Sequence, residues 1–355
     1  MPVTVISKSS VISPVALQRL RFIDIAVNLT DPVFRGIYHG KQKHQDDLDE
    51  MKKRCEAANV KSLIITGTSL RDSHRAIQLA EEHGFYATVG CHPTRSTDFD
   101  NHTDGPQAYL EGLDTLISEN LTGRGRVVAL GELGLDYDRT NHAPIDIQKK
   151  YFRMQLSLAK KYHLPMFLHS RSAHADFIQI LSQEGFGSDG GKFVGGAGGV
   201  VHSFTGTTHE AQDYVNMGFH IGINGCSLKT SENLTAALSI PPQWIMFETD
   251  APWCSCTSTH ASKPHLDQLP LDYRSVFYPA ATQPQRFVLG KPVKGRNEPT
   301  AVGGVAWVIY SLHQQAREEA LARGEQREEV PYWKIVQKAF KNTVELFKLQ
   351  ELIDT

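Results

Sequence analysis

The chain has 355 residues, of which 40% are hydrophobic and 21% are charged, as in an ordinary globular enzyme. Its formal net charge is −2, so a global basic footprint for nucleic acid is excluded. A nuclease is not excluded, because metal ions can neutralise phosphate locally. No apolar run approaches the roughly 20 residues that a membrane span requires, so no contact with a membrane is expected.

The N-terminal stretch and the cysteines bear on location. Residues 1–20 contain no acid and several serines; we expect a flexible N-terminal extension, with a transit peptide as the alternative. The five cysteines are scattered, which favours a reducing compartment. Cys254 and Cys256 are expected to be free thiols, with a soft-metal site as the alternative. Nothing marks export, so we expect the cytoplasm or nucleus, with the mitochondrion as the alternative.

Eight short apolar runs recur along the chain, and they do not alternate with polar residues. Such runs are typical of parallel strands that are covered on both faces. Amphipathic, helix-like segments separate them. Eightfold strand–helix alternation, without a glycine-rich phosphate loop after the first strand, favours an α/β fold of the (β/α)8 TIM-barrel type over an open doubly wound sheet. The runs are 21–27, 62–68, 86–92, 127–132, 165–171, 200–206, 220–226 and 245–250.

No internal repeat and no clean domain boundary interrupts this alternation. We therefore expect residues 21–355 to form a single barrel domain. Three insertions are predicted: a polar, loop-like segment at 95–107, a glycine-rich segment at 185–199, and a long segment containing proline and serine at 253–299. Two helices, near 301–320 and 331–349, are expected to close the chain.

Polar residues stand at the ends of several predicted strands. Barrel enzymes carry their chemistry at the C-terminal ends of the strands. A single histidine or acid there is more often a hydrogen-bonded or turn-capping residue, but several at equivalent ends converge on one barrel mouth. The residues are His92, Glu132, His169, Arg171, His202, Glu248 and Asp250.

Carboxylate and imidazole ligands together suit divalent Mg, Mn or Zn. Glu132 stands between two glycines directly after an apolar run, where an unpaired carboxylate is costly. A carboxylate can bridge two ions that clamp the attacking and leaving oxygens of an in-line displacement. The sequence therefore predicts that Glu132 is a metal ligand and the bridge between two ions.

Nine motifs in order resemble the TatD-type metal-dependent deoxyribonucleases. They are DIAVNLTDPVFRG, IITGTSL, VGCHPT, GELGLDYDR, FLHSR, VHSFTGT, IGINGCS, FETDAPW and RNEP. The similarity runs from about Arg21 to the last predicted helix, and the set is specific although each motif alone is not. The resemblance implies a barrel of the metallo-dependent hydrolase type that hydrolyses DNA phosphodiesters.

The resemblance also implies roles for the strand-end residues. One or two divalent ions, Mg or Mn with Zn as the alternative, would be held by Glu132, His169, His202 and Asp250. His92 would contact the scissile phosphate or the leaving group, and Asp250 or Glu248 would accept the proton of a metal-activated water. Family members are commonly 3′-to-5′ exonucleases that prefer single-stranded DNA and are linked to DNA repair or degradation; RNA remains a possible substrate.

One departure from the family pattern lies in the first strand. Many relatives carry His-x-His there, whereas this chain has Ala26 and Asn28. Asn28 can offer a carbonyl oxygen to a metal or a substrate, and Ala26 can offer nothing. We therefore expect one tightly bound ion and one loosely bound ion.

Substrate phosphates need cations near the barrel mouth. Arg171 could bind a phosphate bidentately, with an ion pair to a neighbouring acid such as Asp136 as the alternative. Lys294 and Arg296 lie in a basic segment, GKPVKGRNEP, that suits a phosphate track or a solvated loop. Aromatic residues just beyond the strand ends could stack on bases, with packing under a loop as the alternative: Tyr137, Phe204 and Trp253.

Three other functions fit parts of the pattern. An amidohydrolase acting on a small amide, lactone or nucleobase uses the same barrel, but usually with the first-strand His-x-His and often a bridging lysine. A small-molecule phosphoesterase would need a closed pocket in place of an open, locally positive mouth. A catalytically inactive binding protein would follow from loss of the first-strand histidines. The oligomeric state is open, and a monomer is favoured.

Overall fold

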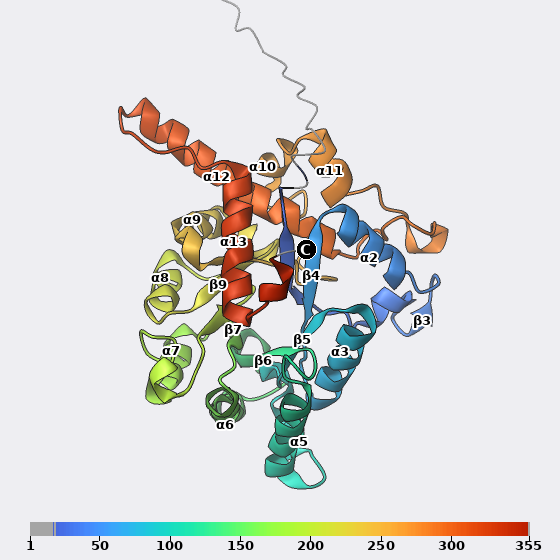
Figure 1. Cartoon of the computed structure of the whole chain (residues 1–355), viewed down its shortest axis with the longest axis vertical. Helices are drawn as coiled ribbons and strands as arrows, with labels where there is room; N and C mark the ends of the chain where they lie inside the picture. Colours follow the sequence, from blue (N-terminus) through green and yellow to red (C-terminus); the bar gives the residue numbers. More distant parts are fainter. Residues whose placement is uncertain (1–16, 18, 354–355) are drawn as a thin grey trace, which may run out of the picture.

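The computed structural model describes residue 17 and residues 19–353, so most of the predicted N-terminal extension lies outside the described residues. Eight parallel strands form one sheet in the order β1-β4-β5-β6-β7-β8-β9-β10, with helices between them (Figure 1). The predicted (β/α)8 barrel is confirmed. The strands are β1 Phe22–Val27, β4 Val60–Ile65, β5 Tyr86–Val89, β6 Val127–Asp136, β7 Met166–Arg171, β8 Gly199–Val201, β9 His220–Ile223 and β10 Ile245–Phe247.

The first and last strands meet along a short seam. Val27 forms an isolated parallel bridge with Ala251. The buried Asp24 carboxylate accepts hydrogen bonds from the Thr249 backbone N–H at 2.9 Å and from its hydroxyl at 2.5 Å. Burial raises the pKa of Asp24 well above its usual value despite these bonds. The seam is therefore held by a buried carboxyl group and by a few backbone contacts, including the bond from the Asn28 N–H to the Ala251 carbonyl at 2.8 Å, rather than by a full ladder of backbone hydrogen bonds.

The helices cover the outside of the barrel. The longest predicted pair, near 301–320 and 331–349, corresponds to α12 and α13. The α-helices that lie wholly within the described residues are α2 Leu48–Ala57, α3 Leu70–His83, α4 Thr97–Asp100, α5 Gly105–Asn120, α6 Ile145–Tyr162, α7 His174–Gln183, α8 Thr208–Asn216, α9 Ser231–Ser239, α10 Lys263–Asp267, α11 Leu271–Phe277, α12 Val302–Ala322 and α13 Tyr332–Phe347. Among the described residues, no helix is both long and apolar enough to cross a bilayer.

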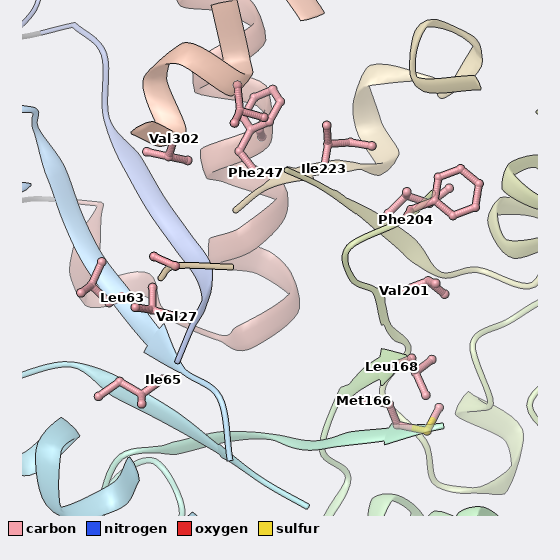
Figure 2. Close-up of a cluster of buried hydrophobic side chains, with 14 of the residues drawn as sticks. Val27, Leu63, Ile65, Met166, Leu168, Val201, Phe204, Ile223, Phe247 and Val302 are labelled. Carbon is pink, nitrogen blue, oxygen red and sulfur yellow. The ribbon is translucent and has the colours of Figure 1, made fainter. Parts of the chain in front are cut away.

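Two hydrophobic clusters share the strands because successive side chains point to opposite faces. The outer cluster lies between sheet and helices, and Figure 2 shows Val302 of α12 together with strand residues such as Leu63 and Ile65. The second cluster takes the alternate strand residues, including Ile64 and Phe167. Phe340 on α13 joins it, and α13 packs against β1 and β10.

The predicted insertions contain more regular structure than their composition indicates. Segment 95–107 was expected to be loop-like, but it contains α4 and the start of α5. Phe99 explains the difference, because its fully buried ring stacks on Tyr151 with 4.3 Å between centroids and anchors the polar segment. Segment 253–299 carries α10 and α11. A small hairpin after β1, with strands Ile37–Tyr38 and Lys41–Gln42, was not predicted.

Candidate active site

The longest strand, β6, places Glu132 in the barrel mouth. Its register against β7 shifts between Gly131 and Leu133, so the strand has a local irregularity of the kind that re-aims a side chain. The two flanking glycines permit this close packing. A Cβ on Gly131 would lie 2.2 Å from the Phe167 carbonyl oxygen, and one on Gly134 would lie 1.9 Å from that of His169.

Three imidazoles, from the ends of β5, β7 and β8, face one oxygen of Glu132. Its Oε1 lies 2.8 Å from Nδ1 of His169 at the end of β7 and 2.7 Å from Nε2 of His202 after β8. His92 follows β5, with its Nε2 3.3 Å from the same oxygen. The sequence prediction that these four residues share one site is consistent with this geometry.

Charge and burial oppose each other within this cluster. Burial favours neutral Glu132, but His92 and His202 outweigh it and hold the pKa of the carboxyl well below its usual value. Burial lowers the pKa of His92. Burial also opposes the charged form of His202, but the carboxylates of Glu132 and Glu248 have the larger effect and raise the pKa of His202 well above its usual value. The carboxylate at the centre is therefore ionised, which is the form that binds cations.

The hydrogen bonds of His92 fix its protonation pattern. Its Nδ1 accepts a hydrogen bond from the Thr94 backbone N–H at 3.1 Å. A neutral imidazole whose Nδ1 accepts carries its proton on Nε2. That Nε2–H points toward Glu132 and the cleft. His92 is therefore set up as a hydrogen-bond donor, which agrees better with the predicted contact to a phosphate or leaving group than with metal ligation.

Asp250 and Asn28 meet beside the seam. Asn28 Nδ2 donates to Asp250 Oδ1 at 2.8 Å, and the Cys254 thiol lies 3.2 Å from Asp250 Oδ2. Burial raises the pKa of Asp250 to about 6. Ala26, the other first-strand departure from the family pattern, is fully buried in the second hydrophobic cluster. Asn28 therefore orients a predicted ligand.

A cleft of about 580 Å³ opens over this cluster. Sequence analysis missed several residues that line it. Asp136, at the end of β6, has Oδ2 3.3 Å from Nε2 of His169, and its i+4 spacing from Glu132 on one strand was the signal that could have revealed it. The cleft is lined by the predicted Asn28, His92, Glu132, His169, Arg171, His202 and Asp250 and, among others, by the unpredicted Asp136, Arg95 and Arg139.

Glu248 was expected to accept a proton from water, and its position contradicts that role. The side chain is fully buried and does not line the cleft. Its Oε1 accepts from the Ser203 backbone N–H at 2.7 Å and from Asn224 Nδ2 at 2.9 Å, and it lies 3.6 Å from Nδ1 of His202. Glu248 lies behind His202, where a carboxylate orients an imidazole and raises its basicity.

Two of the three predicted phosphate-binding cations also lie away from the cleft. Arg296 is buried, and its guanidinium contacts both oxygens of Asp47 at 2.7 Å and Glu298 Oε1 at 2.7 Å. It is therefore an internal ion-pair residue, and the prediction that it binds substrate is wrong. Lys294 is exposed but outside the residues that line the cleft. Arg171 lines it, and no described residue forms an ion pair with its guanidinium.

The donor set fits a divalent cation. One ligand atom from each of His92, Glu132 and His169 lies within 4.8 Å of the others. Nε2 of His169 and Nδ1 of His202 are buried and make no well-formed hydrogen bond among the described residues, although the carboxylates of Asp136 and Glu248 lie 3.3 Å and 3.6 Å from them. Imidazole nitrogens beside an ionised carboxylate are the ligands that Mn and Zn accept, and carboxylate oxygens suit Mg. The cluster is therefore suited to bind such an ion.

A group of carboxylates and imidazoles able to hold a metal, at the C-terminal ends of the strands of a TIM barrel, is typical of hydrolytic enzymes of the metallo-dependent hydrolase type. The chain belongs to the TatD family: residues 23–347 match the family described as TatD related DNase. It is 43% identical over 307 residues, 85% of this chain and 93% of the relative, to a Schizosaccharomyces pombe protein named Deoxyribonuclease Tat-D.

Two further comparisons agree with this family. A Cronobacter sakazakii protein named 3′-5′ ssDNA/RNA exonuclease TatD is 36% identical over 234 residues, 65% of this chain and 78% of the relative. A Saccharomyces cerevisiae structure described as an uncharacterized amidohydrolase has a TM-score of 0.78 at 30% identity, covering 92% of this chain and 99% of the other. The fold and the family are thus shared across nearly the whole chain.

Proposed function

We propose that the protein is a divalent-metal-dependent 3′-to-5′ exonuclease that prefers single-stranded DNA and also accepts RNA. One observation carries this proposal: an ionised glutamate surrounded by three imidazoles lies in a cleft that three arginines line. The acidic and imidazole groups suit a cation, and the arginines suit the phosphates of a strand. The names of the yeast and bacterial relatives support the same activity, which suits trimming of 3′ ends in DNA repair or degradation.

The metal would be Mg or Mn, held by Glu132, His169, His202 and Asp250. When bound, such an ion withdraws charge from a phosphoryl oxygen and makes water a better nucleophile near neutral pH. Asp136, which approaches His169, adds a further carboxylate to the same cluster. Glu132 and Asp136 on β6 and His169 on β7 are held in place by regular strands, so little rearrangement of these three is needed before the substrate enters.

The protein's own groups supply the remaining chemistry. Arg171 is free to bind a phosphate of the strand through two parallel N–H donors. His92 donates from Nε2 to a phosphoryl or leaving oxygen, since Thr94 occupies its Nδ1. Asp250 lines the cleft and is oriented by Asn28 at 2.8 Å, and its carboxylate accepts the proton of the attacking water.

The amidohydrolase alternative has less support. Its usual first-strand imidazoles are replaced by Ala26, which is buried in the core, and by Asn28, which bonds to Asp250. A neutral amide would also leave Arg171 without an anionic partner in the cleft, whereas Arg139 already lies 3.9 Å from the Asp136 carboxylate. A small phosphodiester would supply such a partner, so this class is the one that the experiment must separate from a strand.

The test uses single-stranded DNA labelled at its 5′ end and incubated with the protein and Mg or Mn. A ladder that shortens from the 3′ end is expected, and it should be abolished by EDTA, by Glu132→Ala and by His202→Ala. Lys294→Ala is the control, because this exposed lysine lies outside the cleft and its loss should leave the ladder unchanged. Folded protein that binds Mn but cleaves only small phosphodiesters would overturn the proposal.

A further inference from the structure

A second cavity of about 580 Å³ lies directly beside the catalytic cleft. Arg171, which closes β7, lines both spaces. The rest of its wall comes from the start of α7, from the loop that leads into α8, and from the first turns of α9. These three helices follow one another around the barrel in Figure 1, and α8 packs on α9. A strand in the cleft therefore has a neighbouring compartment on the far side of Arg171.

The lining of this second cavity is unsuited to a phosphate. Arg171 is the only arginine or lysine among the described residues that line it, whereas two carboxylates, Glu210 and Glu232, belong to its wall. The two histidines add no net positive charge to this wall, because the Asp213 carboxylate, 2.9 Å from His174 and 3.4 Å from His209, would offset a charge on either ring. A phosphate in this cavity would face the negative charge of Glu210 and Glu232. We therefore expect the group that binds there to be neutral.

The lining suits a flat neutral group with a polar edge through its hydroxyls and carboxylates. Phe204 and Tyr214 lie against the cavity from the hydrophobic core, where they are only 4% and 2% exposed and their rings meet edge to face at 6.1 Å. Hydroxyl groups such as those of Thr208 and Thr235 also line the cavity. Glu210 keeps acceptor capacity besides the bond that its Oε2 accepts from the Thr207 N–H at 2.6 Å. Carboxylates accept hydrogen bonds from the amino groups of bases.

We propose that this cavity is a nucleobase subsite, which holds one base of the strand while Arg171 binds the phosphate that joins it to the scissile nucleotide. The inference rests on the proposed nuclease function, and it assigns the second cavity to the nucleotide next to the bond that is cut. Arg171 lines both cavities, so binding of the base in one cavity fixes the position of the scissile bond in the other. A dinucleotide too short to fill the second cavity is therefore a poorer substrate than a longer strand.

The experiment moves a single abasic nucleotide along the last five positions of a single-stranded oligonucleotide. In the wild-type protein, the abasic residue should raise KM about fivefold at one position only, the lower end of what a contacted base contributes. Thr235→Trp fills the cavity from an exposed position on α9 and should raise KM for the intact strand by a similar factor. This variant should no longer respond to the abasic residue.

Gln212→Trp is the matched control, because it adds the same side chain to an exposed position on α8 outside the cavity. Its profile should match that of the wild type. Turnover of bis(4-nitrophenyl) phosphate, which has no base, should be equal in all three proteins and reports that they are folded. A flat abasic profile in the wild type, or a Thr235→Trp protein that still responds to the abasic position, overturns the subsite. If the wild type cleaves no strand at all, the result overturns the proposed nuclease function, on which the subsite depends.

Discussion

Arg296 provides the sharpest test of how the structure assigns charged residues. Its guanidinium is 1% exposed and makes three contacts of 2.7 Å with Asp47 and Glu298. Removing one partner of a buried ion pair costs about 3–5 kcal/mol. In Arg296→Met, Arg54 still holds Glu298 at 2.8 and 2.9 Å, whereas Asp47 keeps only a 3.4 Å contact with Arg54. Because only the Asp47 carboxylate is left without a close cationic partner, we expect the lower end of that range, a loss of about 3 kcal/mol in the free energy of unfolding.

The assay combines urea unfolding with steady-state kinetics on single-stranded DNA. Arg296→Met should lower the free energy of unfolding by about 3 kcal/mol and leave KM unchanged at a temperature where it is folded. Arg171→Met should do the reverse, with a raised KM and stability within about 0.5 kcal/mol of the wild type, as for most changes outside the core. An Arg296→Met protein with normal stability and a raised KM would refute this reasoning and would show that Arg296 binds the substrate phosphate.

Three further outcomes are expected. Glu132→Gln removes the charge that faces the imidazoles, so calorimetry should show at least about 100-fold weaker Mn binding; unchanged affinity would remove Glu132 from the ligand set. Gly134→Ala places a Cβ 1.9 Å from the His169 carbonyl oxygen at a φ of 146°, so its urea midpoint should fall sharply, and a normal midpoint would contradict the packing of β6 on β7. Burial lowers the pKa of His220 to about 4, below the unfolded value of about 6.5. The contribution of neutral His220 to the free energy of unfolding is complete above pH 6.5 and declines as pH falls toward 4, with a loss of about 2 kcal/mol at pH 5. When urea unfolding is followed at pH 7 and pH 5, His220→Gln should lose less stability between the two pH values than the wild type. Equal losses in both proteins would contradict this role of His220.

Sequence reasoning located the barrel because its signals are local. Each strand is an apolar run that needs no partner to be recognised, and the polar residues at the strand ends follow from the same runs. Glu132, His169 and His202 were therefore predicted together before any distance was known. Asp136 was missed because β6 extends beyond its apolar part, so the strand end was placed four residues too early.

Errors arose where a role depends on which groups meet in space. Glu248 is two residues from Asp250, yet it is buried behind His202, whereas Asp250 reaches the cleft. Arg296 stands in a basic segment, but its partners include Asp47, 249 residues away in sequence. Neither fact has a signature in local composition. The pairing of charged groups across the barrel is the information that the sequence does not display.

The seam between β1 and β10 has a consequence for how the chain matures during synthesis. A ribosome releases β1 first, but its neighbours across the seam, Thr249 and Ala251, emerge more than 220 residues later, and α13 follows later still. Until then, β1 and β9 both present unpaired strand edges, which are templates for association with other chains. The nascent protein holds all three cleft imidazoles before it holds Asp250, so a chain that has not yet closed the seam has an incomplete site and exposed strand edges that favour association.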